Sequence, residues 1–192
     1  SPDERYFARA VAVADNRRVE LWSLPDLTRR GGFSSDVAVA GLAVSAGGRY
    51  VAVAGSYAVE VREPATEYSV IVQHGSPRAL AFSLDEPTLA IGDGAGTLTL
   101  WKITSLADDA RVRPPGVVKD AGFSHDGRRL VTLSWVPADR VGTRMLERVW
   151  DVGSSREQTS RRRTLAPGVH AFSADGGSLA IDDRGAVVVM DL

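Results

Sequence analysis

Apolar and small residues recur in one fixed pattern five times along the chain. Each unit has a serine that precedes a turn, and a large apolar residue follows that serine six positions later. The serines are Ser1, Ser45, Ser83, Ser124 and Ser173, and the large apolar residues are Phe7, Val51, Leu89, Leu130 and Leu179. Consecutive serines are separated by 44, 38, 41 and 49 residues, which is close to the roughly 40–45 residues of a four-stranded repeat. The pattern therefore predicts repeated units.

Each unit ends in a short segment in which residues alternate along the chain. The segments are 19–22, 59–62, 98–101, 148–150 and 187–190. Alternation with a period of two and an abundance of Val and Leu are typical of β-strands. Turn-forming pairs such as Asp15-Asn16 and Gly55-Ser56 precede several of these strands. Because no long segment has a helical period, the sequence predicts an all-β protein.

The repeats resemble the WD40 family. The likeness rests on Phe123-Ser124-His125-Asp126-Gly127, on Trp150-Asp151, on the segment 96–101, and on His74 ahead of Ala81-Phe82-Ser83. It covers essentially the whole chain and implies a WD40-type β-propeller of about five four-stranded antiparallel blades. The family often buries a hydrogen-bonded set of His, Ser or Thr, Asp and Trp. Here Arg62 and Met190 occupy two tryptophan positions and Ala95 a turn-aspartate position, so we expect packing to depend more on apolar contacts.

The order of strands within the units implies an incomplete ring. In the family the serine closes the innermost strand of a blade, so the first unit begins after that strand and the last stops before its outermost strand. We therefore expect a single propeller domain over residues 1–192, with repeats at about 1–35, 36–73, 74–113, 114–164 and 165–192. By resemblance it is a fragment of a larger propeller of about seven blades; the alternative is a five-bladed ring with two trimmed sheets.

Composition provides no sign of catalysis. The chain has 44% hydrophobic residues, a formal net charge of -1, no cysteine and three histidines, none of which is spaced from another as metal ligands are. No Gly-x-Ser-x-Gly motif occurs, and the glycine-rich segment 92–97 lacks the Lys-Ser/Thr of a phosphate loop. We therefore predict no catalytic residue, no metal, no cofactor and no enzyme.

Two stretches stand out from the repeat as candidates for protein interaction. The first is a long hairpin over residues 134–147, and the second is an arginine run near the outer strand of the fourth unit. Trp, Met and Arg are enriched at interface cores. The alternatives are that the hairpin covers the neighbouring blade and that the arginines guard a sheet edge against aggregation. The candidate residues are Trp135, Arg140, Arg144, Met145, Arg161, Arg162 and Arg163.

These observations favour a cytoplasmic protein-interaction scaffold. Its partner would be another protein or another domain of the same polypeptide, with self-association through open blade edges as a further possibility. The alternative is a propeller enzyme or small-ligand binder that uses the central channel. Nucleic acid is disfavoured because the net charge is near zero and no aromatic residues interleave the arginines. No segment approaches the length of about 18 apolar residues that predicts a membrane span.

Overall fold

The computed structural model describes residues 1–11, 17–66, 68–73, 75–84, 88–103, 107–112, 116–124, 126–136, 144–154, 156–163, 170–173, 177–183 and 186–191. Within these ranges the chain forms eighteen β-strands and one 3-10 turn (Ala46–Gly48), with no α-helix. The prediction of an all-β protein is therefore confirmed.

The described strands form five antiparallel sheets that follow one another along the chain. The first sheet contains β1 (Tyr6–Val11), β2 (Arg18–Ser23) and β3 (Arg29–Ser34). The second contains β4 (Gly41–Val44), β5 (Val51–Ala54), β6 (Ala58–Glu63) and β7 (Tyr68–Gln73). The third contains β8 (Pro77–Phe82), β9 (Thr88–Asp93), β10 (Leu98–Lys102) and β11 (Ala107–Val112). The fourth contains β12 (Val117–Phe123), β13 (Arg129–Val136), β14 (Arg144–Asp151) and β15 (Arg156–Arg163). The fifth contains β16 (His170–Phe172), β17 (Ser178–Asp183) and β18 (Ala186–Asp191).

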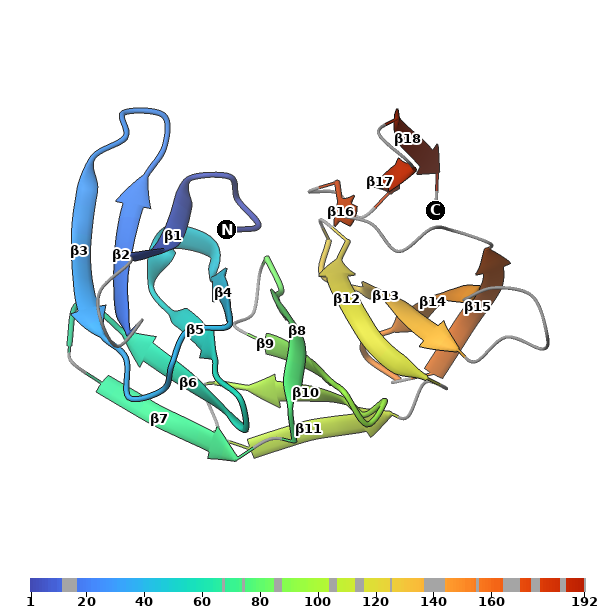
Figure 1. The fold of residues 1–192 in the computed structure, drawn as a ribbon, viewed down its shortest axis with the longest axis horizontal. Coiled ribbons are helices and arrows are strands. Elements are labelled where there is room, and N and C mark those ends of the chain that lie inside the picture. The colour runs from blue at the N-terminus through green and yellow to red at the C-terminus, as the bar shows by residue number, and fades with distance from the viewer. Residues whose placement is uncertain are drawn as a thin grey trace.

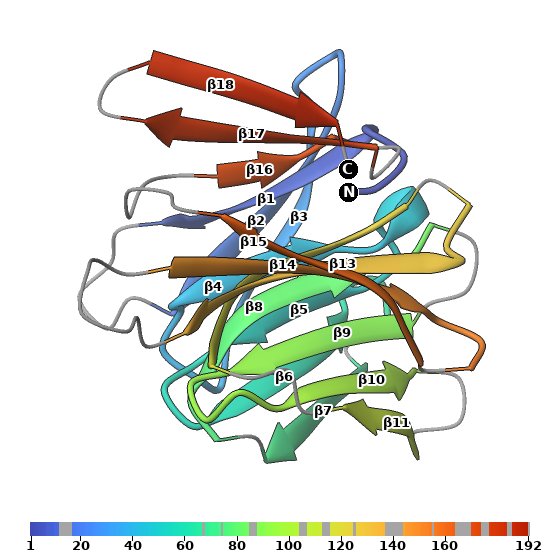
Figure 2. The same ribbon diagram turned by 90° about the vertical axis from the view of Figure 1, so that its right-hand side faces the viewer.

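The sheets are arranged around an arc in a propeller-like fashion (Figures 1 and 2). In every sheet the strands pair in chain order, so each sheet is a simple meander. The strands β4, β8, β12 and β16 each begin a sheet, and each contacts the next along the arc. The first and fifth sheets lie at the two ends of the arc in Figure 1. Each sheet also falls within one of the five repeat ranges.

A hydrogen-bonded turn explains why a serine marks every repeat. In each unit the serine Oγ accepts a hydrogen bond from the backbone N–H five residues later, at 2.9, 2.9, 3.2, 3.0 and 2.8 Å in chain order. In the last four units the serine N–H donates in return to the carbonyl of that same residue. The hydroxyl thus satisfies a backbone donor where the chain turns between two strands.

Each of the first three sheets buries one face against the sheet that follows it. In every sheet we call the face toward the next sheet the trailing face and the opposite face the leading face. Between the first and second sheets the core contains Val19, Leu21, Val44, Val51 and Val53. A second cluster joins the second and third sheets, and a third cluster joins the third and fourth. Because strand side chains alternate between faces, one meander supplies apolar residues to two such cores.

The fourth sheet contains a buried hydrogen bond between the tryptophan that ends its repeat and a threonine of the neighbouring strand. The Trp150 Nε1–H donates to Thr132 Oγ1 at 2.9 Å, and both residues are buried. In the third sheet the buried turn carboxylate is supplied by Asp93, whose Oδ1 accepts from the N–H groups of Ala95 and Thr97. The turn therefore contains an aspartate after all. It lies two residues before Ala95, the position at which the repeat pattern places it.

Candidate interaction surface

The leading face of the first sheet presents an ordered cluster of aromatic and charged side chains. Strand register places Phe7 opposite Trp22 and Arg9 opposite Glu20, so all four side chains share that face. The Phe7 and Trp22 rings stack with centroids 6.3 Å apart, and the Arg9 guanidinium lies 5.0 Å from the Trp22 centroid. These contacts hold the aromatic rings in place before any partner arrives. We call Phe7, Arg9, Glu20, Trp22 and Arg29 the open-face cluster.

Glu20 is the anionic centre of the open-face cluster. Its Oε2 accepts hydrogen bonds from Arg9 Nε at 2.9 Å and from Trp22 Nε1 at 3.2 Å, while its Oε1 lies 3.3 Å from Arg29 Nε. The hydrogen bond from Arg9, followed by that from Trp22, lowers the pKa of Glu20 below its ordinary value. The Glu20 side chain is 12% exposed, whereas those of Arg9 and Arg29 are 56% and 43% exposed. A partner would therefore meet two guanidinium groups around a neutralising carboxylate.

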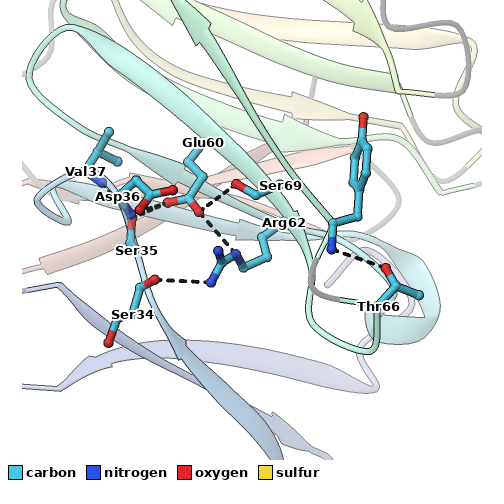
Figure 3. Close-up of polar contacts among 9 residues, drawn as sticks. Ser34, Ser35, Asp36, Val37, Glu60, Arg62, Thr66 and Ser69 are labelled. Carbon is cyan, nitrogen blue, oxygen red and sulfur yellow. Dashed lines mark hydrogen bonds and ion pairs between the residues drawn. The ribbon is translucent and has the colours of Figure 1, made fainter.

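The second sheet shows what covers the same position when another sheet precedes it. Glu60 occupies the place in β6 that Glu20 occupies in β2, and its side chain is fully buried. Its Oε2 accepts from Ser35 Oγ at 2.5 Å and from the Asp36 N–H at 2.8 Å, and its Oε1 accepts from Ser69 Oγ at 3.0 Å (Figure 3). Ser35 and Asp36 follow β3 and connect the first sheet to the second. Glu60 thus fixes that connection to the sheet.

In the second sheet Arg62 occupies the repeat position of the tryptophan, and it makes contacts with the first sheet. Its guanidinium lies 5.0 Å from the Phe33 centroid, and its Nη1 donates to the Ser34 carbonyl at 3.2 Å. Its Nε lies 3.2 Å from Glu60 Oε1, but in an orientation that makes an ion pair and no hydrogen bond. Phe33 and Ser34 both belong to β3, so the arginine joins the second sheet to the first.

The open-face cluster has no equivalent cover among the described residues. On the second sheet, the leading face packs on Val19 and Leu21 and binds the Ser35–Asp36 connection. On the first sheet, Arg9, Arg18 and Arg29 of the leading face are exposed. At the far end of the arc, Val187 and Val189 of β18 are 75% and 66% exposed. Among the described side chains the two ends therefore differ: aromatic and cationic groups are exposed at one end, and two valines at the other.

The structure places six of the seven predicted interaction residues in the fourth sheet, and Arg140 lies outside the described residues. Trp135 is half-buried, and Lys119 Nζ lies 4.1 Å from its ring centroid. Met145 pairs with Trp135 in register and is 4% exposed, on the face opposite to the Leu130 and Trp150 side chains that pack on the third sheet. Met145 is therefore buried on the trailing face, and its role in partner binding stays a prediction that this burial does not favour.

The arginine candidates are described only in part. Arg161, Arg162 and Arg163 belong to β15, the edge strand of the fourth sheet, where their backbones pair with Glu147, Leu146 and Met145. Arg144 begins β14 opposite Val136. The side chains of these four arginines, and the whole of Arg140, lie outside what the structure describes. Their role in partner binding remains a prediction.

The open-face cluster was not predicted from the sequence. In the sequence Trp22 stands out only as the residue that ends a repeat, and Arg9 lies in an ordinary strand segment. A signal was present, because Phe7, Arg9, Glu20 and Trp22 all have the parity that places them on one face of a hairpin. What the sequence does not show is that none of the described sheets packs on this face.

No group of three or more His, Cys, Asp or Glu side chains able to hold a metal ion occurs among the described residues. Within the same part of the chain, no helix has the length and apolar character needed to cross a membrane.

Comparison with known proteins supports the fold alone. No family model matches the chain, and no curated protein matches it. Among solved structures, a chain of hydrazine synthase from Kuenenia stuttgartiensis is similar with a TM-score of 0.74 and 15% sequence identity. The similarity covers 94% of this chain and 53% of that chain, so this chain spans about half of that protein's length. At this identity the likeness defines a class, an all-β protein of propeller-like sheets, and no activity.

Proposed function

We propose that the chain is a non-enzymatic protein-interaction scaffold of the WD40 type, and that a protein partner or another domain of the same polypeptide docks on the leading face of the first sheet. The observation that carries this proposal is the open-face cluster, which combines two aromatic rings and two exposed arginines on an uncovered sheet face. Trp and Arg are the residue types that most often dominate the binding energy of an interface. The five sheets act as blades that hold this surface rigid.

The cluster is suited to binding because it is already organised. Trp22 is held by its ring contacts with Phe7 and Arg9 and by its hydrogen bond to Glu20. Fixing a long side chain on association costs about 0.5–1.5 kcal/mol. In this cluster part of that ordering has occurred before the partner binds.

The experiment compares the wild type with two surface variants. Arg9→Ala removes one cation from the open-face cluster, and Tyr57→Ala is the matched control, because Tyr57 is 75% exposed in the β5–β6 turn. Each protein is immobilised, partners are captured from cells that produce the chain, and the dissociation constant of each partner is then measured with purified proteins. We expect Arg9→Ala to weaken binding by about tenfold or more, and Tyr57→Ala to leave it unchanged.

Circular dichroism and thermal unfolding check that both variants keep the fold. A partner whose affinity is the same for wild type and Arg9→Ala, or is reduced equally by Tyr57→Ala, contradicts the assignment of this face. Turnover of a substrate by the purified chain would contradict the non-enzymatic role.

A further inference from the structure

The last strand of the second sheet, β7, forms an open sheet edge on the outside of the arc (Figure 1). It pairs with β6 on one side, and none of the described strands pairs with it on the other. Alternate backbone N–H and C=O groups of such an edge strand point away from the sheet. An edge of this kind can pair with a strand of another chain.

The last strands of the first four sheets differ in charge. The strand β3 contains two arginines, β11 contains two aspartates and one arginine, and β15 contains four arginines and one glutamate. By contrast, β7 has the sequence Tyr-Ser-Val-Ile-Val-Gln and contains no charged residue. Charged side chains on an edge strand hinder its pairing with other chains. Of these four strands, β7 is therefore the one without that protection.

Contacts on both faces of the second sheet hold β7 in place. On the leading face the Ser69 Oγ donates to Glu60 Oε1 at 3.0 Å. On the trailing face Val70 and Val72 pack against the core cluster that joins the second and third sheets. Ile71 lies opposite Glu60 in register and is 44% exposed. A partner strand would thus meet an ordered edge with an exposed isoleucine, which lowers the cost of ordering on association.

The edge of β18 in the fifth sheet occupies a different position in the repeat. β18 is the third strand of its sheet, and its repeat equivalents β6, β10 and β14 each pair with a fourth strand. Its edge therefore corresponds to an inner position of a sheet, whereas β7 occupies the outermost position. Val188 of β18 is 41% exposed, which is close to the value for Ile71. Val188 is therefore a matched control for Ile71.

From these observations we propose that β7 pairs with β7 of a second copy of this chain, in antiparallel orientation about a twofold axis. The two second sheets then form one continuous sheet. A second copy fits this edge because its own β7 is equally uncharged, and a net charge of -1 gives two copies almost no mutual repulsion. A charged partner strand would find no opposite charge on β7. The surface is separate from the open-face cluster, and the proposal does not rest on the proposed function.

Twofold symmetry restricts the register of the pair. Opposite residues of an antiparallel pair point to the same side of the sheet, so a leading-face residue must lie opposite a leading-face residue of the second copy. The symmetry axis therefore passes through one residue that faces its own equivalent. With Ile71 at that position, the two exposed isoleucine side chains meet, and Val70 lies opposite Val72 of the second copy. Cross-strand pairs of β-branched residues stabilise a sheet.

The dimer should be weak, because one six-residue strand forms a small interface. Interfaces below about 1,200 Å² are typical of transient complexes. We expect a dissociation constant of about 10–500 μM, which sedimentation equilibrium of the purified chain can measure. Because the twofold pairing uses the same edge on both copies, association should stop at the dimer.

Charged variants test the register. Ile71→Lys and Ile71→Glu each place like charges opposite one another and remove the apolar contact, so each should weaken the dimer by about tenfold or more. An equimolar mixture places lysine opposite glutamate and should dimerise about threefold or more tightly than either variant alone. Val188→Lys is the matched control and should leave the dimer unchanged. Arg9→Ala should leave it unchanged too, which separates this edge from the open-face cluster.

A cysteine variant provides a second test that alters the edge little, because the chain has no cysteine of its own. Opposite residues of an antiparallel pair have Cα atoms about 4.5–5.5 Å apart, within the range of about 4.4–6.8 Å that a disulfide spans. We expect Ile71→Cys to form a disulfide-linked dimer in oxidised glutathione about tenfold or more faster than Val188→Cys.

Circular dichroism checks that each variant keeps the fold, and the cysteine variant decides the matter if the charged ones unfold. A wild-type chain that is monomeric at about 1 mM would overturn the proposal. So would a mixture of the two charged variants that dimerises no better than either alone. Equal weakening by Val188→Lys and Ile71→Lys, or equal cross-linking of the two cysteine variants, would also overturn it.

Discussion

Replacing Glu60 by glutamine should destabilise the junction between the first and second sheets. Its two carboxylate oxygens receive hydrogen bonds from Ser35 Oγ, the Asp36 N–H and Ser69 Oγ, and they pair with Arg62. Glutamine has one acceptor oxygen and one donor NH₂ group. Whichever way the amide turns, the NH₂ group faces a donor: the Asp36 N–H on one side or the Arg62 guanidinium on the other.

The magnitude follows from the groups that lose their partners. One charge-assisted hydrogen bond contributes about 1.5–3 kcal/mol, and removing one member of a buried ion pair costs about 3–5 kcal/mol. Arg62 keeps its contact with the Ser34 carbonyl and is 20% exposed, so the full ion-pair penalty does not apply. We expect Glu60→Gln to lower the free energy of unfolding by about 2–4 kcal/mol, a large part of the stability of an ordinary domain.

The assay is urea denaturation at pH 7, together with hydrogen exchange at the Asp36 amide. Glu20→Gln is the matched control, because Glu20 holds the same repeat position on an open face with exposed arginines. We expect the control to change stability much less, and the Asp36 amide to exchange faster only in Glu60→Gln. Equal destabilisation by the two variants, or an unchanged Asp36 exchange rate in Glu60→Gln, would refute the idea that Glu60 fixes the connection between the sheets.

Three further predictions concern the core and the turns. A Cβ on Gly92 would lie 2.4 Å from Val118 Cγ1, so Gly92→Ala should destabilise the fold by about 1–3 kcal/mol; a second change, Val118→Ala, should then cost less than it does alone, as measured by a double-mutant cycle. Thr132→Val leaves the Trp150 Nε1–H without its acceptor, and calorimetry should show a loss of about 1–3 kcal/mol; no loss would mean that the pair is dispensable. Since the pKa of Asp126 is lowered in the fold, its charge stabilises the protein above the unfolded-state pKa and ceases to do so as pH falls through the lower folded-state value. The difference in melting temperature between wild type and Asp126→Asn should therefore shrink below about pH 4, and a constant difference from pH 7 to pH 3 would contradict this.

Much of the fold was predictable because its signals are local. The alternation of Val19 to Trp22 identifies a strand without reference to the rest of the chain, and the serine turn is closed by a bond to a backbone group five residues away. Both features depend on residues within about five positions of one another in the sequence. The first sheet has three strands and the second has four, as the position of the serine motif implied.

The candidate surface was decided by tertiary structure. Glu20 and Glu60 occur in nearly identical segments, Val-Glu-Leu and Val-Glu-Val, so the sequence gives no reason to treat them differently. One is fully buried because Ser35 and Asp36, 25 and 24 residues away, close over it; the other remains on an open face. The burial of Met145 has the same origin, because an apolar residue in a hairpin is exposed or buried according to which sheet lies beside it. Local sequence determines which side of a strand a residue occupies, and only the packing of whole sheets determines what covers that side.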